Sequence, residues 1–407
     1  MKILHTADWH LGKYLGVISR HQEQVAVLEE ICALADAEDV DAVIVAGDLF
    51  DAFNPPVESV ELMYKTLKRL AKNGERAVVA IAGNHDSPER IEAPDPLARE
   101  CGIIFAGYPQ SKVSPFSLTD GISLVRSDEG FVELKLPCSE PPLRILLTPY
   151  ANEARLKAYL GTENRGAELR TMLQAFWSNL ASKYCDERGV NILVAHLFLM
   201  QKGGQKFEES DDEKSIAGPG GAQVINSENI PSGIQYTAMG HLHQHHEVAS
   251  QPCPVMYSGS PLAYSMNEED QDKYVVIIEA EPAKRASIRP VRLKQGKRLV
   301  RKQFTSVGSA VTWLQSNPSV LVELTMATET YLTAAERKRL YNAHSGIDDI
   351  IPLVKSVDGE FAALSTPADL RKSVEELFIE YFHHEQGQTP NKDLLELFRE
   401  IQAVEEE

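Results

Sequence analysis

Cysteine is scarce in this sequence, and the few cysteines present are not arranged for pairing. The five thiols are odd in number, scattered and free of any Cys-x-x-Cys spacing; they stand at positions 32, 101, 138, 185 and 253. This pattern predicts unpaired thiols in a reducing compartment, so we expect a cytoplasmic protein.

Long apolar runs are also missing. No run approaches the ~18 residues that a membrane-spanning helix needs, so we expect no membrane partner. The first strand-like run starts at residue 2, and we therefore expect no signal peptide before it. The length of 407 residues leaves room for two domains.

Positive charge is in deficit. The chain has 41 Lys and Arg against 59 Asp and Glu, a net charge of −18. Proteins that bind nucleic acids usually gain affinity from Lys and Arg on phosphates. The overall charge therefore disfavours a nucleic-acid enzyme, unless a local basic segment, bound cations or a partner offsets it.

What the sequence does contain is a series of short motifs, each after an apolar run. In chain order they are Asp8-Trp9-His10, Gly47-Asp48, Gly83-Asn84-His85-Asp86, Ala195-His196 and Gly240-His241-Leu242-His243. The preceding runs predict buried strands at residues 2–4, 42–45, 78–82, 192–194 and 236–239. A short apolar run that ends in glycine and polar residues is typical of a strand that leads into a ligand loop.

Apart from His85 and Asp86, the motifs supply the ligand types of a two-metal hydrolase: two carboxylates, four imidazoles and one amide oxygen. Two divalent cations about 3.5–4 Å apart need an anion between them, and Asp48 is the natural bridge. In an extended chain, residues two apart face the same side, which would bring Asp8 to His10 and His241 to His243. Oxygen and nitrogen ligands without cysteine suit manganese or iron, with zinc possible.

His85 has a different expected role. It directly follows Asn84 and cannot easily point at the same metal, so we expect it to protonate a leaving alkoxide or stabilise the phosphorus centre. Asp86 would orient its ring, or alternatively cap a helix that begins near Pro88. Any one motif alone is weak, because a single buried histidine such as His196 is often an ordinary core residue.

Several segments resemble the calcineurin-like metallophosphoesterases and, more narrowly, the SbcD family of bacterial nuclease subunits. They are MKILHTADWHLG at 1–12, VAGDLFD at 45–51, AGNHDS at 82–87, MGHLHQ at 239–244 and YSGSPLAYS at 257–265. The resemblance implies an α/β fold, a two-sheet α/β/β/α sandwich with a small α+β capping domain and C-terminal partner-binding helices. Asp51 stands where some relatives carry a second histidine, which leaves its role open. We expect it, like Asp86, to lie just outside the metal ligands.

The resemblance also implies a division of the ligands between two divalent metals, with manganese preferred, and His85 as the catalytic histidine. The first metal would be held by Asp8, His10, Asp48 and His243. The second would be held by Asp48, Asn84, His196 and His241.

The implied activity is that of a manganese-dependent DNA nuclease subunit in DNA break processing. It would cut duplex ends as an exonuclease and single strands and hairpins as an endonuclease. The implied partners are DNA and an SbcC-like, SMC-type ATPase, with the chain as a homodimer within a heterotetramer. Two alternatives stay open: a phosphoesterase of this fold for a small molecule or phosphoprotein, and a non-catalytic scaffold, for which lost ligands would be the sign.

We predict three regions along the chain. Residues 1–281 would form the nuclease domain, with helices at 22–37, 57–72 and 169–183, short strands in 118–150, and a Gly-rich acidic loop at 203–221. Residues 282–373 would form the capping domain, with strands at 320–325 and 350–355 and a helix at 334–343. Residues 374–407 would form a helical segment for partner binding.

Two segments outside the motifs carry further expectations. Nine Lys or Arg and no acid lie between Lys284 and Lys302. This segment is either a DNA-backbone surface or an ordinary exposed β-hairpin face. The predicted DNA contacts are Arg289, Arg292, Lys294, Lys297 and Arg298.

The acid-rich tail has an apolar stripe in residues 393–404, made of Leu394, Leu397, Phe398, Ile401 and Val404. The stripe fits a partner's groove or, alternatively, a packed contact with its own domain.

Overall fold

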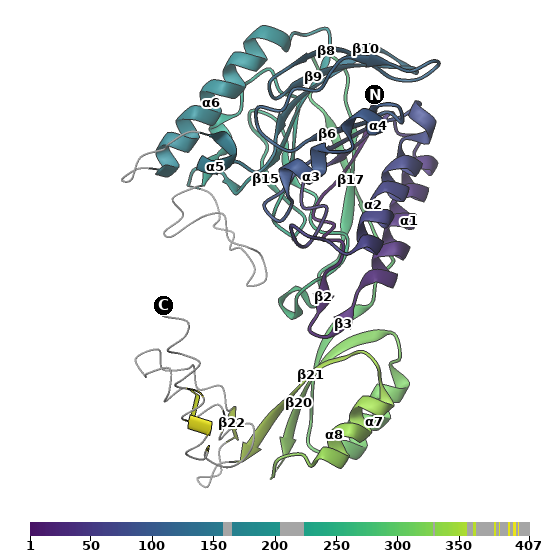
Figure 1. Ribbon diagram of the computed structural model, residues 1–407, viewed down its shortest axis with the longest axis vertical. Helices are drawn as coiled ribbons and strands as arrows, with labels where there is room; N and C mark the ends of the chain where they lie inside the picture. The colour runs from purple at the N-terminus through teal and green to yellow at the C-terminus, as the bar shows by residue number, and fades with distance from the viewer. Residues whose placement is uncertain are drawn as a thin grey trace. The chain divides into compact units, whose positions relative to one another are not determined.

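The structure is a computed structural model. It describes residues 1–157, 165–203, 224–328, 330–355 and 361–363, together with Phe378, Ile379, Phe382, Pro390, Leu394, Leu395 and Phe398. The chain divides into two compact units (Figure 1). The first unit comprises Met1–Lys302, Ser316–Glu323 and His344–Asp349, and the second comprises Gln303–Gln315, Leu324–Ala343 and Ile350–Glu407.

The first unit contains a six-stranded sheet in the order β18-β17-β1-β4-β5-β6. The four neighbouring strands β1, β4, β5 and β6 run parallel to one another. Strand β17 is antiparallel to β1, and β18 is antiparallel to β17. The bounds are β1 (Lys2–Thr6), β4 (Ala42–Val45), β5 (Ala77–Ile81), β6 (Ile103–Ala106), β17 (Tyr274–Glu279) and β18 (Ser287–Arg292).

A second sheet has eight strands in the order β15-β16-β14-β11-β10-β9-β8-β7. Strands β10, β11, β14 and β16 are parallel, and the remaining strands extend the sheet by antiparallel pairing. The bounds are β7 (Phe116–Ser117), β8 (Ser123–Asp128), β9 (Phe131–Leu136), β10 (Ser139–Thr148), β11 (Val190–His196), β14 (Tyr236–Gly240), β15 (His246–Ala249) and β16 (Val255–Tyr257).

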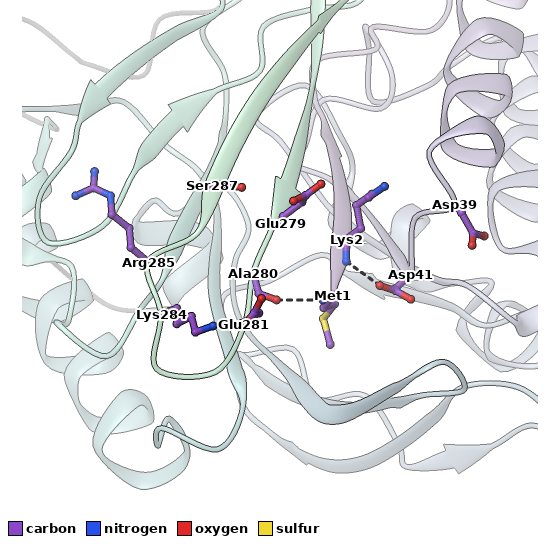
Figure 2. Close-up of a pocket in the computed structure, with 10 residues that line it drawn as sticks. All are labelled: Met1, Lys2, Asp39, Asp41, Glu279, Ala280, Glu281, Lys284, Arg285 and Ser287. Carbon is purple, nitrogen blue, oxygen red and sulfur yellow. Dashed lines mark hydrogen bonds and ion pairs between the residues drawn. The ribbon is translucent and has the colours of Figure 1, made fainter.

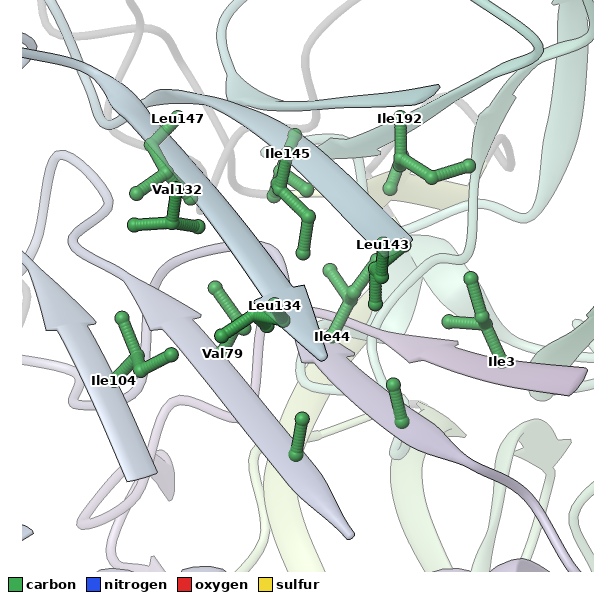
Figure 3. Packing of buried hydrophobic residues seen from close by; sticks show 14 of the residues in the cluster. Ile3, Ile44, Val79, Ile104, Val132, Leu134, Leu143, Ile145, Leu147 and Ile192 are labelled. Carbon is green, nitrogen blue, oxygen red and sulfur yellow. The ribbon is translucent and has the colours of Figure 1, made fainter. Parts of the chain in front are cut away.

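The two sheets face each other across an apolar core (Figure 3). Ile44 of β4 and Val79 of β5 pack there with Ile145 of β10 and Ile192 of β11. The neighbouring residue Val45 points the other way, into a second core beneath helices. Because both faces of the sheet are covered there, β4 and β5 are apolar at every position rather than at alternate positions.

Helices cover the outer face of each sheet. α1 (His21–Ala37) and α2 (Val57–Leu70) pack on the six-stranded sheet, and α6 (Arg165–Tyr184) packs on the eight-stranded sheet. The short helices α3 (Pro88–Glu92), α4 (Asp95–Arg99) and α5 (Glu153–Leu156) lie in connections. These four layers confirm the predicted α/β/β/α sandwich.

The C-terminal part of the described chain contains a separate four-stranded sheet in the order β19-β20-β21-β22, with two helices. Helix α8 has the predicted bounds, whereas α7 was not predicted. The elements are β19 (Arg298–Phe304), α7 (Val307–Ser316), β20 (Val320–Thr328), α8 (Ala334–Ala343), β21 (Ile347–Lys355) and β22 (Phe361–Ala363). Two small pairs complete the list: β2 (Tyr14–Leu15) with β3 (Ile18–Ser19), and β12 (Leu199–Met200) with β13 (Ile225–Asn226).

The basic segment 284–302 lies on a β-hairpin only in its first part. Strand β18 pairs antiparallel with the preceding strand β17, whereas β19 belongs to a different sheet and does not pair with β18. The acidic loop expected at 203–221 falls, from residue 204 on, outside the described residues, and so does most of the tail stripe. Within the described ranges, no helix has the length and apolar character needed to cross a membrane.

Candidate metal centre

The predicted ligands follow the carboxyl ends of parallel strands in both sheets. Asp8, Asp48 and Asn84 come shortly after β1, β4 and β5, which run parallel in the six-stranded sheet. His196 ends β11, and His241 directly follows β14, its parallel neighbour in the other sheet. Loops at the same end of parallel strands lie together, which is where open α/β sheets bind ligands.

One group of ligand atoms gathers around His10. Its Nε2 lies 3.0 Å from Nε2 of His243 and 3.6 Å from Oδ2 of Asp48. Asp8, His10 and Asp48 each offer an atom within 4.8 Å of the others, and all three residues are buried. Two imidazole nitrogens and two carboxylates that converge in this way form a cluster suited to a divalent cation.

A second group gathers around His196. Its Nε2 lies 2.9 Å from Oδ1 of Asn84 and 3.3 Å from Oδ2 of Asp48. Its Nδ1 contacts the carbonyl oxygen of Ala46 at 2.9 Å. A carbonyl only accepts, so Nδ1 carries a proton and Nε2 is the candidate ligand nitrogen. The ring of His241 lies 5.6 Å from the ring of His196, centroid to centroid.

Asp48 belongs to both groups. Its Oδ2 is the carboxylate oxygen near His10 and near His196, while its Oδ1 accepts the backbone N–H of His85 at 2.8 Å. A shared carboxylate between two clusters is the arrangement expected of a bridging ligand.

The donor set fits two cations. Oδ1 of Asp8 accepts the backbone N–H of His241 at 2.9 Å, but its buried Oδ2 has no hydrogen-bond partner among the described residues. Such an atom costs free energy unless a cation or water satisfies it.

The electrostatics without metal show how strongly the centre attracts positive charge. Burial raises the pKa of the Asp8 carboxyl to about 7. Burial lowers the pKa of His196, but the adjacent Asp48 carboxylate outweighs it and raises that pKa to about 9. Burial acts to raise the pKa of Asp48 as well, yet the neighbouring histidines hold it well below its usual range. In the metal-free chain, protons would therefore bind at the side chains where divalent cations would bind more favourably.

The ligand loops are strained, which corrects the extended geometry that we expected for them. Asp8, His10 and Asp48 have φ of 56°, 44° and 47°, and His241 has φ of 113°. A residue other than glycine in this region costs roughly 1–3 kcal/mol and persists only where surrounding structure enforces it. After β1, β4 and β14 the backbone turns left-handed at the candidate ligands, so these side chains do not converge through the alternation of an extended chain.

Two glycines permit this convergence. A Cβ on Gly47, which also has φ of 95°, would lie 2.2 Å from Nδ1 of His196. A Cβ on Gly83 would lie 2.1 Å from Oδ1 of Asp48 and 2.4 Å from its backbone nitrogen. The loops from different strands therefore pack so closely that only glycine fits between them.

His85 lies beside the first group, where it, His10 and Asp51 offer atoms within 4.8 Å of one another. Its Nδ1 donates to the carbonyl oxygen of Asp51 at 2.8 Å, which leaves Nε2 available. The ring is half-buried and lies 4.8 Å from the ring of His10, nearly perpendicular to it. This position suits a group that exchanges protons with a substrate near the cations.

Asp51 and Asp86 both support the centre, but Asp86 does so differently from our expectation. The Asp51 carboxylate lies 3.5 Å from Nδ1 of His10 and 3.2 Å from Nζ of Lys13. Asp86 neither orients the His85 ring nor caps α3, whose N-cap is Ser87. Its carboxylate instead accepts the backbone N–H groups of Gly83, Leu49 and Phe50, at 2.9, 3.1 and 2.9 Å. It therefore ties the Gly83 loop to the Asp48 loop.

The predicted DNA contacts are largely occupied by acidic partners. Arg289 pairs with Glu38, Arg292 with Asp272 and Arg298 with Asp270. Lys294 and Lys297 are exposed, and their backbone N–H groups are bound by carboxylates of α1. The positive field of this segment is therefore much weaker than its sequence suggests.

The start of the basic segment lies away from the centre. Lys284 and Arg285 line a cavity of about 440 Å³ together with Met1 and Lys2, at the amino end of β1 (Figure 2). The candidate ligand Asp8 follows the opposite end of that strand. This cavity is therefore separate from the metal centre.

Sequence reasoning missed three residues beside His243: Tyr264, Glu268 and Lys273. Tyr264 packs edge-on against the His10 and His243 rings, and its hydroxyl donates to the carbonyl of Trp9. The segment YSGSPLAYS was the available signal, because it resembles the family without containing a ligand.

The chain is similar in sequence to a known protein family and to named relatives. The model of the calcineurin-like phosphoesterase family matches residues 1–245. The chain is 32% identical over its full length to a Bacillus subtilis protein named as the D subunit of the nuclease SbcCD, covering 99% of that protein. It is 32% identical to the protein of the same name from Rhodobacter capsulatus, over 69% of this chain and 66% of that protein. A dimetal phosphatase structure from Danio rerio aligns with 72% of this chain and 96% of its own, at 11% identity and a TM-score of only 0.39.

The chain is thus a metallophosphoesterase, and membership of that class implies bound divalent metals. Within the class it belongs to the SbcD family of nuclease subunits, which confirms the resemblance noted in its sequence.

Proposed function

We propose that this chain is the nuclease subunit of an SbcCD-type complex and hydrolyses DNA phosphodiesters with two manganese ions. The observation that carries the proposal is the pair of ligand clusters that share Asp48. One ion would be held by Asp8, His10, Asp48 and His243, and the other by Asp48, Asn84, His196 and His241. Bound together, such ions clamp a phosphate and lower the pKa of an attacking water.

The chain's own residues supply the proton chemistry and the alignment. His85 is oriented through Nδ1 by the Asp51 carbonyl, so its protonated Nε2 would donate to the leaving alkoxide. Asp51 also keeps its carboxylate beside the outer nitrogen of His10. Asp86 holds the loops of Asn84 and Asp48 in register. These contacts fix the site before substrate arrives, which is the condition for efficient positioning.

The substrate is proposed to be duplex DNA ends for exonuclease action, and single strands and hairpins for endonuclease action. The similarity to proteins named as nuclease subunits supports this over a phosphoesterase for small molecules or phosphoproteins. A non-catalytic scaffold is not favoured, because every ligand position of the family pattern is filled.

The partner is proposed to be an SbcC-like ATPase, since the relatives are named as one component of the nuclease SbcCD. The proposed assembly is a heterotetramer with two copies of this chain. We keep residues 1–281, 282–373 and 374–407 as nuclease, capping and partner-binding regions. A cytoplasmic location is supported by the five free thiols.

The direct test is a nuclease assay on linear duplex DNA with Mn²⁺, with and without the partner ATPase. We expect manganese-dependent shortening of the duplex, and a change in that activity when the ATPase and ATP are added. Hydrolysis of a small phosphomonoester without any cutting of DNA would favour the alternative phosphoesterase.

The partner-binding role of the tail has its own test. Phe398, from the tail stripe, stacks on Phe378 with ring centroids 4.0 Å apart, so part of the stripe is covered within the chain. We propose that the rest docks on the ATPase. Deletion of residues 388–407 should spare the nuclease activity of the isolated chain and abolish co-purification with the ATPase. Full recovery of the partner would make the stripe an internal contact.

Within the basic segment, we propose DNA contacts only for the exposed residues Lys294 and Lys297. Reversal of Lys294 and Lys297 to glutamate should lower the salt dependence of DNA binding by roughly one unit of slope per lost phosphate contact. Hydrolysis of a small phosphodiester should not change. Arg289→Glu is a matched control, because Arg289 is already paired with Glu38. An unchanged slope in the lysine variant would make this segment an ordinary exposed face.

A further inference from the structure

A buried ion pair lies beside the metal centre and belongs to none of its ligand motifs. Glu268 and Lys273 are 2% and 9% exposed, and the ammonium group contacts Oε2 of the carboxylate. Burying two charges costs several kcal/mol per ion after relaxation, and is sustained only when further hydrogen bonds satisfy both groups. The groups around Glu268 and Lys273 must therefore satisfy both charges.

The Glu268 carboxylate is held in place from three sides. Its Oε1 accepts the backbone N–H groups of Tyr264 and Ser265, at 2.9 and 3.2 Å. Its Oε2 contacts Nζ of Lys273. The same Oε1 lies 3.5 Å from Nδ1 of His243. The carboxylate is therefore fixed at the outer nitrogen of a candidate ligand.

Lys273 joins this carboxylate to the backbone of the same histidine. Its Nζ donates to the carbonyl oxygen of His243 at 3.0 Å and to Oγ of Ser260 at 3.1 Å. With Glu268 as the third acceptor, all three ammonium protons have partners. The lysine thus holds both the main chain of His243 and the carboxylate that faces its ring.

The geometry has a known chemical consequence for metal-binding histidines. A carboxylate at one ring nitrogen fixes the ring's orientation and protonation, directs the other nitrogen to the cation and makes it more basic. In His243 that other nitrogen, Nε2, already points at Nε2 of His10, 3.0 Å away.

We propose that Glu268 and Lys273 are positioning residues for one of the two metals. Glu268 sets the ring of His243 through Nδ1, and Lys273 holds Glu268 and the His243 backbone in register. The inference rests on the proposed two-metal centre. It also predicts an asymmetry: His196, in the other cluster, is oriented by the Ala46 carbonyl instead, so loss of the ion pair should weaken only the cation bound with His10.

The test is a calorimetric titration of the metal-free, full-length chain with Mn²⁺. Glu268→Gln keeps the shape and an acceptor for the two backbone N–H groups but removes the charge. We expect one of the two binding constants to fall about 10–100-fold, the usual effect of losing such an outer partner, while the other stays unchanged. Glu269→Gln is the matched control, since Glu269 is the next residue and pairs with Arg301, and it should leave both constants as in the wild type.

Variants of Lys273 show whether weaker binding in Glu268→Gln could come from a folding defect. Lys273→Met should weaken the same single constant, and Lys273→Arg should recover part of it, with thermal unfolding of each metal-free chain as the check on folding. Two unchanged constants, or an equal fall in both, would overturn the positioning role. A wild-type chain that binds fewer than two manganese ions would instead overturn the proposed function, and this inference with it.

Discussion

Replacing Gly83 with alanine would insert a methyl group into the contact between two ligand loops. The new Cβ would lie 2.1 Å from Oδ1 of Asp48 and 2.4 Å from its backbone nitrogen, and real Cβ atoms essentially never approach closer than 3.0 Å. One of the two contacts is main chain, so rotation of the Asp48 side chain alone cannot relieve it. The Asp48 loop or the Asn84 loop must therefore move.

The size of this movement determines how much activity the Gly83→Ala variant should lose. Relief of both contacts needs a shift of roughly 0.6–0.9 Å, and a misplacement of about 1 Å typically costs on the order of 10²-fold in rate. Overpacking of this kind also destabilises a fold by about 1–3 kcal/mol. We expect Gly83→Ala to lose about two orders of magnitude in phosphodiesterase activity, with weaker metal binding, while the chain remains folded.

The assay is the initial rate of hydrolysis of bis(p-nitrophenyl) phosphate over a range of Mn²⁺ concentrations. Gly308→Ala in α7 is the control, because its Cβ would meet nothing within 4 Å. That variant should keep full activity. A Gly83→Ala chain with activity within about threefold of wild type would refute the packing argument.

Three further predictions concern single residues. His85→Ala should keep both metals by elemental analysis but lose ~10²–10⁴-fold in rate; loss of metal would mean that His85 is a ligand. Asp48→Ala should bind at most one metal and be inactive, and two retained metals would assign the bridge to another residue. His5 is fully buried between the Tyr236 hydroxyl and the Met239 carbonyl, and burial lowers its pKa to about 3. The unfolded imidazole takes up a proton near pH 6.5, so the metal-free chain should lose stability as the pH falls from 6.5 toward 3, by up to about 1.4 kcal/mol per pH unit. Urea unfolding at pH 7.5 and 5.5 should show a smaller loss for His5→Gln, and an equal loss would exclude His5 as the source.

The sandwich was expected from the family resemblance. Individual elements were predictable because β4 and β5 are apolar at every position and helices such as α2 have a clear 3–4 spacing. β4 and α8 have the predicted bounds, and α1 begins one residue earlier than predicted. Helix α7 was missed, since its sequence VGSAVTWLQS contains glycine, valine and threonine, which are poor helix formers. The separate sheets of β18 and β19 were missed because strand partners are chosen by long-range contacts that a local pattern does not contain.

The sequence predicted which residues make up the candidate centre, but it did not predict how they are arranged in space. The motifs identify His10 and His243, but only the structure brings their Nε2 atoms to 3.0 Å. Left-handed backbone at Asp8 and His10 replaces the extended chain that their spacing suggested. The acidic partner of Arg289 lies in the loop after α1, 251 positions away in the sequence. A basic run read along the chain therefore overstated the charge that a phosphate would meet.

The most direct measurement of the central claim is anomalous scattering at the manganese edge from crystals grown with Mn²⁺. We predict two peaks on either side of the Asp48 carboxylate. One should lie among Asp8, His10 and His243, and the other among Asn84, His196 and His241. A single peak, or two peaks that do not share Asp48, would contradict the two-metal account.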